Sequence, residues 1–161
     1  MTSPVLVLGL GNLLLTDDAV GLRMLEALEA ESTDPDVDFV DGGTQGIALT
    51  GYLSGRSAVL VLDAIGLGAA PGTVHVLRDD DIAQLRSRRS TNAHEGNGLS
   101  LIETVRVLGN FPARLAVVGV EPALVKTGIG LSPEVEAAMR LALDQAREIL
   151  VEFAARETSC V

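Results

Sequence analysis

Residues 5–21, VLVLGLGNLLLTDDAVG, combine an apolar run, a glycine-containing turn and a pair of aspartates. The first six residues are apolar at almost every position, which is typical of a strand covered on both faces. Gly9 and Gly11 match a dinucleotide-binding fingerprint, but Leu14 stands where its third glycine is required. Asp17 and Asp18 would place negative charge at the helix end where a pyrophosphate must bind. The stretch therefore favours a cation over a nucleotide as its ligand.

Apolar and β-branched runs alternate with helical patterns along the chain. The strand-like runs are residues 5–10, 37–41, 58–65, 73–77 and 114–120. Helices are expected after Asp17, over residues 47–53, from Asp79, over residues 98–108, and from Pro133 to about residue 155. This alternation predicts a three-layer α/β domain with a mostly parallel sheet. Only about seven residues separate the third run from the fourth, too few for a parallel crossover, so the fourth strand is expected to run antiparallel to the third.

Length and composition predict one domain. The chain has 161 residues, of which 47% are apolar, enough for a substantial core over residues 1–161 with an end that frays from about residue 155. No apolar run approaches the length of a membrane span, and no signal segment precedes the first strand. The only cysteine, Cys160, cannot form an intrachain disulfide. We therefore expect a cytoplasmic protein that makes no membrane contact.

The charge balance argues against nucleic acid as a partner. The chain carries 22 acidic and 12 basic residues, a formal net charge of -10. Binding to a phosphate backbone requires clustered lysine and arginine, and base stacking requires aromatic side chains. Aromatic residues make up only 2% of this sequence. A nucleic-acid-binding function is therefore not expected.

Acidic residues follow three of the predicted strands. Asp17 and Asp18 come after the first strand, Asp41 ends the second and Asp63 ends the third. Ligands of α/β sheets collect beyond the carboxyl ends of the strands, so these carboxylates share one crevice if the second and third strands flank the first. An acid after a strand is commonly a helix cap, and we expect Asp17 to be one. Asp63 ends a core strand, where a charge requires a cation or hydrogen bonds.

Two histidines and a glycine-rich loop complete the candidates. His94 lies in a polar loop from which it could point into the crevice, whereas His75 lies inside the fourth strand, where a structural or surface role is expected. Two carboxylates and one imidazole would suit a divalent metal such as zinc or nickel. The loop DGGTQG, residues 41–46, could let a substrate chain approach closely, and a plain turn is an equally good interpretation.

Four longer segments follow one another along the chain: GLGNLLLTDDAVG, DGGTQG, LVLDAIGLGAAPGTVHVL and VVGVEPALVKTGIGLSPEVEAA. Together they resemble the maturation endopeptidases of [NiFe]-hydrogenases, over residues from about 5 to 150. The resemblance implies an endopeptidase that removes a C-terminal extension from the hydrogenase large-subunit precursor after nickel insertion. It also implies a five-stranded mixed, twisted sheet of the phosphorylase/hydrolase-like type, with strand order 2-1-3-5-4 and strand 4 antiparallel.

The resemblance also implies roles for individual residues. A metal site is implied at Asp18, Asp63 and His94, which are expected to act in catalysis as well. Asp41 is expected to be a general base or an organiser of its loop. The positions expected to bind the substrate chain are Gly42, Gly43 and Thr44. Nickel is expected to arrive with the precursor, and zinc or cadmium could occupy the same site.

Two other functions remain open for the same residues. A non-catalytic nickel chaperone or sensor would bind the metal and never shorten a partner. A divergent nucleotide-binding domain would bind NAD or ATP, and the aspartate pair argues against it. The expected partner is the large-subunit precursor, and the protein itself is expected to be a monomer.

Overall fold

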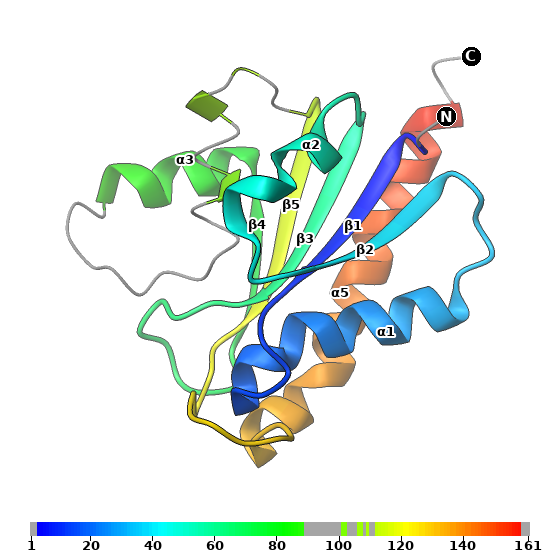
Figure 1. Ribbon diagram of the computed structural model, residues 1–161. Helices are drawn as coiled ribbons and strands as arrows, with labels where there is room; N and C mark the ends of the chain where they lie inside the picture. The colour runs from blue at the N-terminus through cyan, green and yellow to red at the C-terminus, as the bar shows by residue number, and fades with distance from the viewer. Residues whose placement is uncertain (1–2, 89–100, 103–105, 108, 110–111, 159–161) are drawn as a thin grey trace.

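The computed structural model describes residues 3–88, 101–102, 106–107, 109 and 112–158. A twisted sheet runs through the middle of the molecule, with α1 (Val20–Glu31) and α5 (Pro133–Thr158) packed on one face (Figure 1). Residues of α2 (Thr50–Leu53) and α3 (Asp79–Arg88) pack on the other face. This is the three-layer arrangement that the sequence predicts. Within the described residues, none of the helices combines the length and apolarity needed to cross a bilayer.

The sheet has five strands in the order β2-β1-β3-β5-β4. Their bounds are β1 (Val5–Leu10), β2 (Val37–Gly43), β3 (Ala58–Ala64), β4 (Val74–Arg78) and β5 (Arg114–Val120). All neighbouring strands are parallel except β4, which is antiparallel to β5. The predicted strand order and the direction of the fourth strand are both confirmed. Because β2 and β3 lie on either side of β1, the carboxyl ends of these three strands are neighbours.

The helices begin close to the predicted positions and differ in detail. A short 3₁₀-helix, η1 (Thr16–Ala19), precedes α1. A second one, η2 (Gly46–Leu49), leads into α2, where a single helix is predicted. α5 extends to Thr158, about three residues beyond the predicted end of this helix. The predicted helix over residues 98–108 lies largely outside the described residues, although residues 101–102 and 106–107 are helical.

The core consists of two apolar layers divided by the sheet. Every residue of β3 is buried, and its side chains alternate between the layers. Leu60 and Leu62 pack toward α1 and α5, whereas Val59 and Val61 pack toward the opposite face. Since side chains in a strand point alternately to the two faces, burial on both faces requires an apolar residue at nearly every position. This explains the continuous apolar runs in the sequence.

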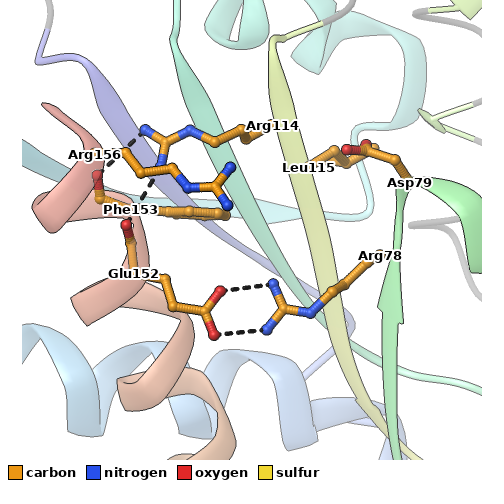
Figure 2. Close-up of a pocket in the computed structure, with 7 residues that line it drawn as sticks. All are labelled: Arg78, Asp79, Arg114, Leu115, Glu152, Phe153 and Arg156. Atoms are coloured by element: carbon orange, nitrogen blue, oxygen red, sulfur yellow. Dashed lines mark hydrogen bonds and ion pairs between the residues drawn. The ribbon is translucent and has the colours of Figure 1, made fainter. Parts of the chain in front are cut away.

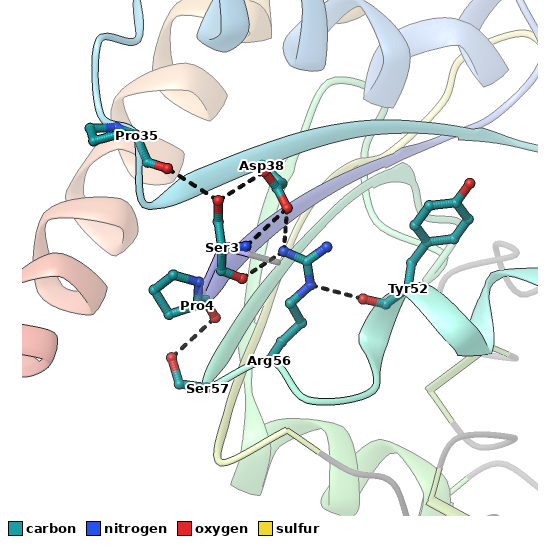
Figure 3. Close-up of polar contacts among 7 residues, drawn as sticks. All are labelled: Ser3, Pro4, Pro35, Asp38, Tyr52, Arg56 and Ser57. Carbon is teal, nitrogen blue, oxygen red and sulfur yellow. Dashed lines mark hydrogen bonds and ion pairs between the residues drawn. The ribbon is translucent and has the colours of Figure 1, made fainter. Parts of the chain in front are cut away.

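A buried arginine ties the amino ends of three strands together. Arg56, which precedes β3, donates hydrogen bonds to the carbonyl oxygens of Tyr52 and Ser3, at 3.0 Å and 2.6 Å, and to the carboxylate of Asp38 (Figure 3). Ser3 in turn donates its hydroxyl to Asp38 at 2.9 Å. The hydrogen bond from Arg56 lowers the pKa of Asp38 below its ordinary value. The charge at this end of the sheet is thus neutralised by pairing.

Two further arginines fasten the last turns of α5 to the same end of the sheet. Arg78 forms a bidentate ion pair with Glu152, with N–O distances of 2.9 Å and 3.0 Å (Figure 2). Arg114 donates to the main-chain carbonyl oxygens of Glu152 and Phe153 and stacks 5.0 Å from the centroid of the Phe153 ring. The residues that make these contacts line a pocket of about 200 Å³. They attach residues 152 and 153 of α5 to β4 and β5.

A close approach at Gly21 places the start of α1 on the carboxyl ends of two strands. A Cβ atom at this position would lie 2.3 Å from the carbonyl oxygen of Leu62 in β3 and 2.6 Å from that of Leu10 in β1. Both distances are too short for any side chain, so only glycine allows this contact. The contact brings η1 and its aspartates to the edge of the sheet where β3 ends.

Candidate active site

The carboxyl edge of the sheet collects the predicted acidic residues. Asp63, at the end of β3, is only 1% exposed, and its Oδ1 accepts a hydrogen bond from the Ala64 N–H at 2.8 Å. Asp18 lies in η1, which contacts β3. Its Oδ2 accepts a hydrogen bond from the Asn12 N–H at 2.9 Å. The two predicted metal-binding carboxylates therefore belong to elements that are in contact.

Asp18 is a partly desolvated acid. Burial raises the pKa of Asp18, and the hydrogen bond from the Asn12 N–H offsets only part of that increase. The ionised form of a carboxylate in such a place is stabilised when a cation binds to it. The role of Asp18 as a metal ligand stays a prediction.

Asp17 is not the helix cap that we predict from the sequence. Neither η1 nor α1 has a side-chain cap, and the Asp17 carboxylate lies 0% exposed against the loop between β5 and α5. It accepts hydrogen bonds from the N–H groups of Ala123 and Leu124, both at 2.9 Å, and from the N–H and hydroxyl of Ser132 at 2.7 Å and 2.8 Å. The 3₁₀ turn at η1 directs this side chain toward that loop.

The pKa of Asp17 shows how strongly these donors act. Burial alone would raise the pKa of this carboxyl, but the hydrogen bonds from Ser132, Leu124 and Ala123 together lower it below its ordinary value. A buried carboxylate can remain ionised when several donors point at it. Asp17 is therefore a structural anion that joins two loops.

The same two loops are connected by their main chains. Residues 12–18 and 121–132, which we call the paired loops, exchange hydrogen bonds from Thr16 N to Gly128 O at 2.9 Å and from Gly128 N to Leu14 O at 2.8 Å. The Thr16 hydroxyl donates to Leu124 O at 2.7 Å. Thr16 has a φ of 46°, a left-handed conformation that costs a non-glycine residue energy. The surrounding hydrogen bonds offset this strain and fix the backbone that carries Asp18.

The DGGTQG segment begins as the end of β2, which runs to Gly43 with a shifted register opposite Gly9 and Leu10, and it turns at Thr44. Oδ1 of the exposed Asp41 accepts a hydrogen bond from the Gly43 N–H at 2.9 Å. A Cβ at Gly42 would lie 2.8 Å from side-chain carbons of Leu10 and Leu49, so Gly42 serves close packing against the core. Gly43 has a φ of 49°, and its carbonyl oxygen accepts from the Gly11 N–H at 3.0 Å. Of the predicted substrate-binding residues, Gly43 and Thr44 are the ones on the accessible side of this turn.

His94 lies within residues 89–100, which are outside the described part of the chain. Among the residues that the structure does describe, no group of three or more histidine, cysteine, aspartate or glutamate side chains is placed to hold a metal ion. A site made of Asp18, Asp63 and His94 therefore stays a prediction, in which the two carboxylates come from described elements and the imidazole from outside the described residues.

Glu121 is an acidic residue at this edge that our sequence reasoning missed. It lies directly after β5, is buried, and accepts hydrogen bonds from the N–H groups of Leu67 and Gly68 at 2.9 Å and 3.0 Å. Its Oε2 also lies 2.8 Å from Nε2 of His75. The structural role expected for His75 fits this contact. The signal for Glu121 was present in the sequence, because it follows an apolar strand just as Asp63 terminates one.

Known proteins match this chain over nearly its whole length. The family model for hydrogenase maturation protease matches residues 22–149. The Hydrogenase 2 maturation protease of Escherichia coli strain K12 is 41% identical over 159 residues, covering 95% of this chain and 96% of its own. The hydrogenase expression/formation protein HoxM of Azotobacter vinelandii is 36% identical over 155 residues, covering 94% of this chain and 75% of its own.

A solved structure agrees with the sequence matches. The hydrogenase maturating endopeptidase HybD from E. coli superposes with a TM-score of 0.81 at 39% identity, covering 94% of this chain and 93% of its own. Sequence and fold comparisons therefore agree over most of the chain. On this evidence, the chain belongs to the hydrogenase maturation protease family.

Proposed function

We propose that this protein cleaves a [NiFe]-hydrogenase large-subunit precursor and removes its C-terminal extension after nickel has been inserted. The observation that carries the proposal is the buried Asp63 at the carboxyl edge, next to the element that holds the partly desolvated Asp18, in a chain of this family. Two such carboxylates at one edge create a negative potential that suits a bound cation. Membership of a protease family makes peptide cleavage the chemistry that this edge supports best.

Nickel enters this proposal as part of the substrate. Asp18 and Asp63, with His94 from outside the described residues, would engage the nickel held in the precursor. Carboxylate and imidazole are ligands that nickel accepts, and the same set would take zinc or cadmium when no precursor is bound. Contact with the loaded metal would position the scissile bond at the carboxyl edge and make cleavage depend on completed nickel insertion.

Peptide cleavage here would rely on carboxylates rather than on a hydroxyl or thiol nucleophile. The sequence contains neither Gly-x-Ser-x-Gly nor His-Glu-x-x-His, and its single cysteine lies at position 160 near the chain end. Gly43 and Thr44 would contact the substrate chain beside Asp41. The hydrogen bond from the Gly43 N–H supports Asp41 as organiser of this turn, and a role as general base is the alternative.

We also place the protein in the cytoplasm as a monomer. A single cysteine fits a reducing compartment, since it cannot form an intrachain disulfide. Sedimentation of the purified protein tests the oligomeric state, and fractionation of cells that produce it tests the compartment.

The decisive experiment mixes the pure protein with nickel-loaded or nickel-free large-subunit precursor and measures masses. We expect the loaded precursor alone to lose a C-terminal peptide. Asp18→Asn should abolish this loss while the circular dichroism spectrum and melting temperature stay close to those of the wild type. Asp36→Asn, an exposed aspartate in the loop before β2, is the control and should cleave normally.

Two outcomes would contradict the proposal. Cleavage by Asp18→Asn at the wild-type rate would remove Asp18 from the site. Nickel binding without any shortening of a cognate precursor would favour the nickel chaperone or sensor instead.

A further inference from the structure

The paired loops present a group of exposed apolar side chains beside the candidate active site. The group consists of Leu14, Leu124, Val125 and Ile129, whose exposed fractions run from 41% to 79%. The other large apolar side chains exposed in the described part of the chain are Tyr52 on α2, Val107, and Leu141 and Val151, which lie ten residues apart on α5. Isolated exposed apolar residues are ordinary on protein surfaces, whereas a group on two adjoining loops indicates a contact surface.

This surface is held in place by the structure beneath it. Leu124 O accepts hydrogen bonds from Asp17 N at 3.1 Å and from the Thr16 hydroxyl at 2.7 Å. Gly128, next to Ile129, donates its N–H to Leu14 O and accepts at its carbonyl oxygen from the Thr16 N–H. Loops joined in this way cannot fold their apolar side chains inward without breaking hydrogen bonds to a buried carboxylate. A preorganised surface loses little conformational entropy when a partner binds.

We propose that the apolar surface formed by Leu14, Leu124, Val125 and Ile129, together with Lys126, binds an extended apolar segment of the precursor close to the bond that is cut. This inference rests on the proposed function and adds a docking surface to it. Its carrying observation is continuity, because Leu14 and Asp18 belong to the same loop. That loop is closed by hydrogen bonds from Asn12 N to Asp18 Oδ2 and from Leu14 N to Asn12 Oδ1, each at 2.9 Å.

The positive charge of Lys126 indicates which kind of segment would bind to this surface. Lys126 is the only lysine of the chain, and it is exposed within the apolar group. A carboxylate on the bound segment, such as the free C-terminus of the extension, would pair with it. A second copy of this chain is a poor occupant, because two molecules that each carry a net charge of -10 repel one another. The surface therefore fits an apolar segment with a carboxylate.

The test compares matched variants for binding and cleavage of a nickel-loaded precursor. Val125→Ser with Ile129→Ser should raise KM, and the Kd measured with the immobilised precursor, by about tenfold, and should leave kcat within about twofold of the wild type. Lys126→Glu should raise both constants, and Lys126→Arg should restore them. Val151→Ser is the control, since Val151 is 69% exposed on α5 and lies outside this surface.

The outcomes separate this inference from the proposed function. If the wild type binds the precursor without cutting it and the serine variant binds more weakly, the surface stands and the proteolytic function fails. If the wild type cuts and the serine variant has the same KM and Kd, the surface is excluded while the function stands. A wild type that binds no precursor, or that dimerises through Ile129 in sedimentation experiments, also overturns the docking surface.

Discussion

The carboxylates at the two ends of the sheet differ in their hydrogen-bond partners. At the amino end, arginines pair with carboxylates, as Arg56 does with Asp38 and Arg78 with Glu152. At the carboxyl end, Asp17 receives its described hydrogen bonds from main-chain N–H groups and a hydroxyl. Pairing with arginine cancels a charge, whereas hydrogen bonds from neutral donors stabilise the charge and leave it in place. The arginine pairs stabilise the amino end, and the proposed function assigns cation binding to Asp18 and Asp63 at the carboxyl end.

The largest effect is expected from neutralising Asp63 at the carboxyl end. Asp63→Asn keeps an oxygen that can accept the Ala64 N–H and removes the charge. We expect processing of nickel-loaded precursor to fall by about a hundredfold or more, because the proposed metal ligand loses its charge. Single-turnover mass spectrometry measures this change.

The fold must survive for this result to be informative. Asp36→Asn, in the exposed loop before β2, removes the same charge elsewhere and should cleave at the wild-type rate. Near-normal cleavage by a well-folded Asp63→Asn variant would show that the charge at the end of β3 has no part in the reaction.

The second effect is expected from the structural anion Asp17. Asp17→Asn places an amide nitrogen against N–H donors from Ala123, Leu124 and Ser132, so some of them lose their acceptor inside the protein. Unfolding in urea should show a loss of about 3 kcal/mol. A double-mutant cycle with Ser132→Ala should give strong coupling, because the two side chains share a hydrogen bond. Additive effects of the two changes would contradict this role.

The strands and their order follow from local features of the sequence. Runs such as VLVLGL, residues 5–10, need burial on both faces, and the short link before β4 permits only an antiparallel strand. The roles of Asp17 and Asp18 could not be read in the same way. The donors to Asp17 lie more than 100 residues away in the chain, at sequence separations of 106, 107 and 115. A local pattern contains no information about such contacts, so a nearby helix was the only visible partner.

The candidate site was predictable to the extent that it depends on strand ends. Asp63 stands out because a charge at the end of an apolar strand requires compensation. The same reasoning applies to Glu121 and was not extended to it. Gly42 differs again, because its packing against Leu10 and Leu49 depends on how the loop folds back over the core. Sequence reasoning identified the loop, and only the fold separates its packing residue from the accessible Gly43 and Thr44.

A third, smaller effect is expected at the amino end. Arg56→Met retains much of the apolar stem and removes the donors to Asp38 and to the carbonyl oxygens of Ser3 and Tyr52. The cost should be about 2 kcal/mol in urea unfolding, because Asp38 is partly exposed and its remaining charge stays hydrated. Folded Arg56→Met should cleave the precursor at the wild-type rate. A specific loss of cleavage would show that the two ends are coupled.

The smallest effect is the pH dependence of stability at the neighbouring aspartates. The folded pKa of Asp17 is lowered, so its contribution is present above the ordinary aspartate pKa and is lost as pH falls through the lowered value. The folded pKa of Asp18 is raised by burial, so its contribution is full below the ordinary pKa and is lost as pH rises through the raised value. Asp18→Asn escapes that loss, and should be more stable than the wild type at about pH 7, by less than about 1 kcal/mol, and equally stable at about pH 3. Urea unfolding at both pH values measures the difference. A variant destabilised at neutral pH would mean that the ionised Asp18, like Asp17, stabilises the folded structure, which would contradict this prediction.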